Sequence, residues 1–320
     1  MLHITSGESV RIHETGLPGD VVYWLDILHE GPVPAGLSLP DMSQVRGRFL
    51  TAAGYAPEGA TDVLRARDAA LARYTGHEET VLWFEHDLYD QLQLIQILDW
   101  FLLHERAGRR LSLICIGKFP GIGRFKGLGQ LTSEQLFSLF DKRQEVTLAD
   151  LKYAAEAWAA FSSPDPRDIE EVISIRTDNL PYLKGALQRH LEQFPSVQTG
   201  LARTEWQILE AVAAGNHLRE EVFLGDQDKE ERVFLGDAVF DAYARRMCDC
   251  REPLLAWFMD RCEITPAGER VLRGQADAVE LNGFSRWLGG VHLKGRQVEW
   301  RWDEKQKRLI RKDPARAHRN

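Results

Sequence analysis

The segment Glu85-His86-Asp87 places two carboxylates and an imidazole directly after the apolar residues 81–84. Carboxylate oxygens are the ligands that Mg²⁺ and Mn²⁺ prefer, and one or two of them suffice beside water and phosphate. An imidazole gains or loses a proton near neutral pH. Glu85 and Asp87 are therefore candidate ligands of a Mg²⁺ or Mn²⁺ cofactor, and His86 is a candidate catalytic acid or base.

A second polar pair, His29 and Glu30, follows the mainly apolar residues 21–28. Two apolar runs thus each end in a histidine and a carboxylate, and this repetition is the main reason to expect a ligand pocket. We interpret His29 and Glu30 as further candidate catalytic residues. A histidine at such a position is more often a hydrogen-bonded structural residue, so that alternative stays open.

A glycine-rich basic loop at residues 117–129 supplies a third set of candidates. Lys118, Arg124 and Lys126 lie between its glycines. Loops of this kind bind phosphate and other small anions, so the three residues are candidate anion-binding residues. The loop lacks the G-x-x-x-x-G-K-[ST] motif of P-loops, and three cations on a solvated loop are an equally good interpretation.

Helix capping offers an alternative for the acidic residues. Asp87 directly precedes residues 88–102, whose apolar spacing predicts a helix, and an aspartate at that position caps the helix N-terminus. Asp90, in the first turn, is favoured by the positive end of the helix dipole. The acidic residues therefore have two interpretations. They cap the helix and do nothing more, or at least Glu85 has a role in a site.

Apolar runs alternate with helical patterns through residues 1–162, which predicts an α/β domain with a mainly parallel sheet of about four strands and flanking helices. Ligands of such sheets bind at the carboxyl ends of the strands, so we expect the pocket there. The predicted strands are 2–5, 21–28, 81–84 and 111–116, and the predicted helices include 43–54, 61–74, 88–102 and 147–161.

The second half is predicted to be helical and winged-helix-like at residues 163–280, followed by a Trp-rich, basic appendix at 281–320. Residues 216–241, where a helix-turn-helix would lie, hold eight acidic residues and three basic ones. Because duplex DNA binding depends on cations that contact phosphates, we expect a protein partner here at least as much as nucleic acid.

Composition is ordinary for a soluble globular protein, with 44% hydrophobic and 28% charged residues and a net charge of −8. No uncharged apolar run approaches the roughly 20 residues of a membrane span, and the first residues do not resemble a signal peptide. These features predict a cytoplasmic protein without a membrane partner. The spacing of Cys248, Cys250 and Cys262 is not that of structural zinc sites.

Several segments together resemble an uncharacterised bacterial family that is catalogued as domain of unknown function 1835. Its members share an H-x-V-N-G-D-S pattern, an L-H-E-G-P strand end and an E-H-D-x-x-D-Q segment before a long helix. The corresponding residues are 3–9, 28–32 and 85–91, and the resemblance continues at 286–293. This resemblance implies kinship over most of the chain and implies no particular activity.

Residues 124–136 are similar to the K-G-L-G-E-M-x-x-x-Q-L stretch of type II topoisomerases, which lies close to their metal-binding Toprim domain. That domain uses a glutamate after its first strand and D-x-D after a later one, and Glu8 and the pair Glu85/Asp87 occupy comparable places. The chain departs from the pattern, since it has E-x-D and a shifted Glu8. The similarity implies metal-dependent phosphoester chemistry.

Two functions follow as expectations. The first is a regulatory or accessory protein whose α/β pocket binds a small anionic ligand or a metal, and whose C-terminal half contacts a protein or nucleic acid. The alternative is a Toprim-like, divalent-metal-dependent phosphoesterase or nuclease. In that enzyme Glu85 and Asp87 would hold the ion, and His29 or His86 would transfer a proton.

Overall fold

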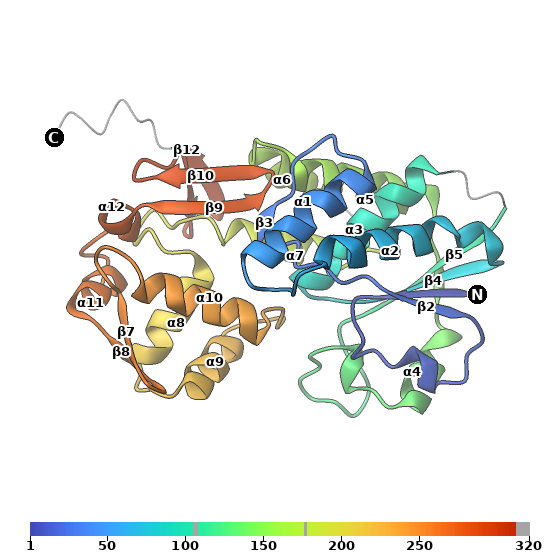
Figure 1. Cartoon of the computed structure of the whole chain (residues 1–320), viewed down its shortest axis with the longest axis horizontal. Coiled ribbons are helices and arrows are strands. Elements are labelled where there is room, and N and C mark those ends of the chain that lie inside the picture. Colours follow the sequence, from blue (N-terminus) through green and yellow to red (C-terminus); the bar gives the residue numbers. More distant parts are fainter. Residues whose placement is uncertain (105–107, 176–177, 312–320) are drawn as a thin grey trace. The chain divides into compact units, whose positions relative to one another are not determined.

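The computed structural model describes residues 1–104, 108–175 and 178–311 (Figure 1). Two compact units divide the chain: the first comprises residues 1–188 and 289–291, and the second comprises residues 189–288 and 292–320. The connection predicted at 162–166 lies within the first unit. Residues 312–320, the end of the predicted basic appendix, lie outside the described part.

The first unit contains a five-stranded sheet in the order β2-β1-β4-β5-β6. The first four strands in this order are parallel, and the two-residue β6 is an antiparallel edge. The mainly parallel α/β sheet predicted from the sequence is therefore confirmed. The strand bounds are β1 Leu2–Thr5, β2 Asp20–Tyr23, β4 Glu79–Glu85, β5 Arg110–Ile116 and β6 Gln144–Glu145.

The prediction of a strand over residues 21–28 was wrong in its length, because β2 ends at Tyr23. Beyond Tyr23, backbone carbonyls accept hydrogen bonds from side chains. The Gln93 amide donates to the Asp26 carbonyl at 3.1 Å, and the Arg46 guanidinium donates to the Ile27 carbonyl at 2.8 Å. The segment is thus held as an irregular connection that leads to the short strand β3 (Gly31–Pro32).

Helices flank the sheet, and most of them begin at side-chain caps. Asp87, Thr132 and Thr147 each accept a hydrogen bond from a backbone N–H in the first turn of the helix that follows. The helix α3 is buried along most of its length and packs against α5. The bounds are α1 Leu39–Ala52, α2 Ala60–Ala72, α3 Leu88–Leu103, α4 Ser133–Phe140, α5 Leu148–Ser162, α6 Arg167–Val172 and α7 Leu183–Leu191.

The glycine-rich loop after β5 is packed against the sheet rather than freely solvated. Its residues Phe125 and Leu128 belong to one buried apolar cluster with Val81 and Trp83 of β4. Burial of a phenylalanine or leucine side chain stabilises by about 1.5–3 kcal/mol relative to exposure. The loop therefore has a defined position at the end of β4, where the polar segment begins.

Residues 203–272 of the second unit form helices and an antiparallel hairpin. The helix α8 packs against α9, α10, α11 and β8, and β7 pairs antiparallel with β8. The winged-helix assignment itself stays a prediction. The bounds are α8 Arg203–Ala213, α9 Arg219–Asp228, α10 Asp237–Cys248, β7 Leu255–Phe258, β8 Arg261–Ile264 and α11 Pro266–Leu272.

The remaining elements of the second unit are short. The Trp-rich appendix forms strands, of which β11 and β12 pair antiparallel. Residues 289–291, which join β9 to β10, are assigned to the first unit. The bounds are α12 Ala278–Asn282, β9 Phe284–Gly289, β10 Val291–Gly295, β11 Trp300–Asp303 and β12 Arg308–Arg311.

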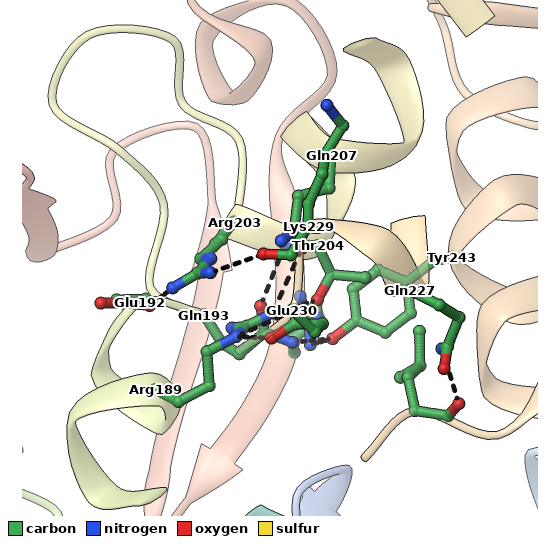
Figure 2. Close-up of polar contacts among 12 residues, drawn as sticks. Arg189, Glu192, Gln193, Arg203, Thr204, Gln207, Gln227, Lys229, Glu230 and Tyr243 are labelled. Carbon is green, nitrogen blue, oxygen red and sulfur yellow. Dashed lines mark hydrogen bonds and ion pairs between the residues drawn. The ribbon is translucent and has the colours of Figure 1, made fainter. Parts of the chain in front are cut away.

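A buried polar cluster lies inside the second unit (Figure 2). Arg189 forms an ion pair with Glu230 at 2.6 Å and donates to the Thr204 hydroxyl at 2.9 Å. Nearby, the Gln193 amide donates to the Tyr243 hydroxyl at 2.7 Å. Because buried polar groups are costly without partners, the bond from Gln193 helps to fix the position of the Tyr243 hydroxyl. Among the described residues, none of the helices combines the length and the hydropathy that a membrane crossing requires.

Candidate metal centre

Three carboxylates meet where β4 passes into α3. Glu85 is the last residue of β4, Asp87 is the N-cap of α3 and Asp90 lies in its first turn. One oxygen from each lies within 4.8 Å of the others, and all three residues are buried. We call these residues the acidic triad. It is the one group of at least three acidic, histidine or cysteine ligands at such spacing among the residues that the structure describes.

Backbone hydrogen bonds hold the acidic triad in place. The Glu85 N–H donates to Asp90 Oδ1 at 2.8 Å, and the Asp90 N–H donates to Asp87 Oδ1 at 3.1 Å. The Ser6 hydroxyl, after β1, also bonds to Asp90. The turn from strand to helix and the neighbouring parallel strand thus position the triad. The N-cap hydrogen bond of α3, from the Asp90 N–H to Asp87, is one of the bonds that do so.

The glycine-rich loop lies directly on Glu85. The Leu128 N–H donates to Glu85 Oε1. A Cβ atom at Gly127 would lie 2.1 Å from Glu85 Oε2, well inside van der Waals contact. Only a residue without a side chain allows the loop backbone to approach this carboxylate so closely.

Burial and mutual repulsion make the ionised triad unfavourable. Burial, followed by the Asp87 charge, raises the pKa of Glu85 to about 8. Burial and the charges of Glu85 and Asp87 also raise the pKa of Asp90 well above its usual range. The triad therefore retains a proton at neutral pH, which a divalent cation would displace on binding. An all-carboxylate donor set suits Mg²⁺ or Mn²⁺ better than the softer zinc ion.

Stability is expected to fall with rising pH because of these raised pKa values. Folded Glu85 titrates near pH 8, against an ordinary value of 4.5, so the folded state binds more protons between these limits. The free energy of unfolding should decrease by up to about 1.4 kcal/mol per pH unit and per proton. Urea denaturation of the wild type and Glu85→Gln between pH 5 and 8.5, with EDTA present, tests this prediction. The free energy of unfolding of Glu85→Gln should depend less on pH than that of the wild type. The same pH dependence in both proteins would contradict the prediction.

The three candidate catalytic residues lie outside the acidic triad. The His86 ring packs against those of Phe125 and Tyr182, each at a centroid distance of 5.9 Å. The His29 ring lies 6.0 Å from that of Tyr89, the residue before Asp90. Glu30 is buried, and its backbone carbonyl accepts from Arg46 at 2.7 Å.

The three candidate anion-binding side chains, Lys118, Arg124 and Lys126, are exposed. Lys126 directly precedes Gly127, and its backbone N–H donates to Gln130 Oε1 at 2.6 Å. The structure thus places the backbone of this basic loop beside Glu85.

Sequence reasoning missed Asp90 as a site residue, although its spacing gave a signal. In E-x-D-x-x-D across a strand-to-helix turn, the third acid lies one helical turn beyond the N-cap and returns toward the strand end. The exposed Glu8, suggested by the topoisomerase similarity, is not a member of the triad.

Comparison with protein-family models, with curated proteins and with solved structures found no match. The two family resemblances stay predictions.

Proposed function

We propose that the first unit binds Mg²⁺ or Mn²⁺ at Glu85, Asp87 and Asp90 and acts on a phosphoester as a metal-dependent phosphoesterase or nuclease. The observation that supports this proposal is the meeting of three buried carboxylates within 4.8 Å. A cluster of this kind is unfavourable without a cation, and its oxygens match the preference of hard cations.

The basic loop and two histidines of the first unit would suit phosphate chemistry. A bound cation would polarise a phosphoryl oxygen and offset the charge that develops during displacement. Lys118, Arg124 and Lys126, on the loop that contacts Glu85, would add positive charge toward an anionic substrate. His29 and His86 are the proposed proton-transfer groups.

A binding function without turnover is the second candidate. The order of α8, α9, α10, the β7–β8 hairpin and α11 supports a winged-helix-like second half. Residues 216–241 hold eight acidic and three basic residues, which favours a protein partner over duplex DNA. The protein would then be an accessory factor that carries a metal-dependent ligand site, and it would not hydrolyse a phosphodiester probe such as bis(p-nitrophenyl) phosphate.

Thermal melting with and without Mn²⁺ tests the metal site in both functions. At about 100 times its dissociation constant, a ligand stabilises by about 2.7 kcal/mol, so the melting temperature of the wild type should rise by several degrees. Glu85→Gln should lose this rise. Asp99→Asn is the matched control, because Asp99 is a partly buried acid of α3 outside the triad. A wild type that does not respond would contradict the proposal.

A further inference from the structure

A small cavity lies in the first unit, between the start of α1, the C-terminal half of α3 and Trp158 of α5. These three helices are labelled in Figure 1. The volume of the cavity is about 250 Å³. An apolar cavity of about 150 Å³ is large enough to bind benzene, so this cavity has room for an aromatic ring with a short chain.

Most of the residues that line the cavity are apolar. Trp100 and Trp158 supply two indole rings, and Leu37, Met42 and Leu103 are among the other lining residues. Leu37 is 39% exposed and Leu103 is 74% exposed. A ligand with an apolar ring would cover part of this apolar surface, and its removal from water favours binding.

Asp99 is the one acidic residue that lines the cavity among the described residues. Gln96, Trp100 and Leu103 line it too, and their spacing from Asp99 is helical. Asp99 therefore lies on the face of α3 that borders the cavity. Its side chain is half-buried, and burial raises its pKa to about 6. Partial removal from water without a compensating charge thus disfavours the ionised carboxylate.

The described part of the chain supplies no cation for the Asp99 carboxylate. Asp99 has neither an ion pair nor a side-chain hydrogen bond there, and no described lysine or arginine lines the cavity. His104 does line it, but its Nδ1 bonds to the Trp100 carbonyl at 2.7 Å and its ring stacks on that of Trp100 at 3.9 Å. The negative charge at the cavity is therefore open to a cationic ligand.

The end of α3 adds to this preference for a cation. Asp99 lies four residues before the end of the helix at Leu103, and the last turn contains no basic residue. The C-terminal end of a helix carries partial negative charge, which favours cations. The start of α1 also borders the cavity, but Ser38 caps it and Asp41 lies in its first turn. Its positive end is thus already compensated and adds little attraction for an anion.

We propose that this cavity binds a small organic amine that carries an apolar ring. The ammonium group donates a charge-assisted hydrogen bond to the Asp99 carboxylate, and the faces of the indole rings attract it. The ring contacts the apolar lining. An organic cation suits the cavity better than Mg²⁺ or Ca²⁺, which would leave most ligand positions to water in largely apolar surroundings. This site does not depend on the acidic triad, of which Asp99 is not a member.

Calorimetric titration of the full chain at pH 8 tests the proposal, with 2-phenylethylamine, 2-phenylethanol and ethylamine as separate probes. EDTA is present, so that binding does not depend on a metal ion at the acidic triad. Asp99, with a pKa of about 6, is ionised at this pH. We expect 2-phenylethylamine to bind at least about tenfold more tightly than the alcohol, which lacks the charge, or ethylamine, which lacks the ring.

Asp99→Asn should weaken the binding of 2-phenylethylamine at least about tenfold, because a hydrogen bond between two charged groups is lost. Asp62→Asn is the matched control, since Asp62 is an exposed acid of α2 that does not line the cavity. It should leave the affinity for the amine unchanged. Equal affinities of Asp99→Asn and the wild type would overturn the proposal.

Leu103→Lys keeps the proposal testable if Asp99→Asn does not fold, because Leu103 is exposed. The new ammonium group would lie four residues from Asp99 on the same face of α3 and would pair with it. Leu103→Lys should therefore weaken amine binding more than the uncharged Leu103→Gln does. No binding of 2-phenylethylamine at millimolar concentration, or equal affinities for the amine and the alcohol, would also overturn the proposal.

Discussion

Arg46→Met is expected to lower the free energy of unfolding by about 3–5 kcal/mol, because it leaves a buried carboxylate without its cation. Arg46 and Asp26 form an ion pair at 2.8 Å in which both side chains are fully buried. Arg46 also donates to the carbonyls of Ile27 and Glu30, at 2.8 and 2.7 Å. The substitution would therefore release the segment that carries the His29-Glu30 pair.

Urea denaturation followed by circular dichroism measures this loss. Arg65→Met is the control, because Arg65 is an exposed arginine of α2 that bonds to Gln44, and it should cost less than about 1 kcal/mol. Arg46→Met/Asp26→Asn should recover part of the loss, since no unpaired charge remains. A loss below about 1 kcal/mol in Arg46→Met would contradict a structural role for the pair.

Gly127→Ala is expected to weaken Mn²⁺ binding about 10- to 100-fold while all three carboxylates are retained. The new Cβ would lie 2.1 Å from Glu85 Oε2, so either the loop or the carboxylate must move. The bond from the Leu128 N–H to Glu85 would then be lost. Loss of a contact that orients a metal ligand typically has an effect of this size.

Gly123→Ala is the matched control for this prediction. Gly123 lies in the same loop, and a Cβ atom there would meet no atom within 4 Å. Its effect on the Mn²⁺ dissociation constant, measured by calorimetric titration, should be less than about twofold. Equal affinities of Gly127→Ala and the wild type would show that the loop does not orient Glu85.

The parallel core could be predicted because its strands lie in short, mainly apolar runs. The run at 21–28 indicated burial rather than a strand: Trp24 and Leu28 are fully buried, although β2 ends at Tyr23. The reason lies in distant side chains. Gln93 and Arg46 take the carbonyls that a strand would use, and no local pattern in residues 21–28 reveals such partners.

The acidic triad could be predicted only in part. The sequence leaves open capping alone or a site role for at least Glu85; in the structure Asp87 caps α3 and also belongs to the triad. Asp90 joins it because the first helical turn returns toward the strand end. The packing of Leu128 and Gly127 against Glu85 depends on contacts more than 40 residues apart in the chain, which spacing alone does not show.

Calorimetric titration of Mn²⁺ at pH 7, in buffers of different ionisation enthalpy, tests the central claim most directly. The wild type is predicted to bind one Mn²⁺ and to release at least one proton, because Glu85, with a pKa of about 8, must ionise and the pKa of Asp90 is also raised. Glu85→Gln should bind far more weakly, whereas Asp99→Asn should match the wild type. Absence of binding by the wild type, or binding without proton release, would contradict a metal centre at Glu85, Asp87 and Asp90.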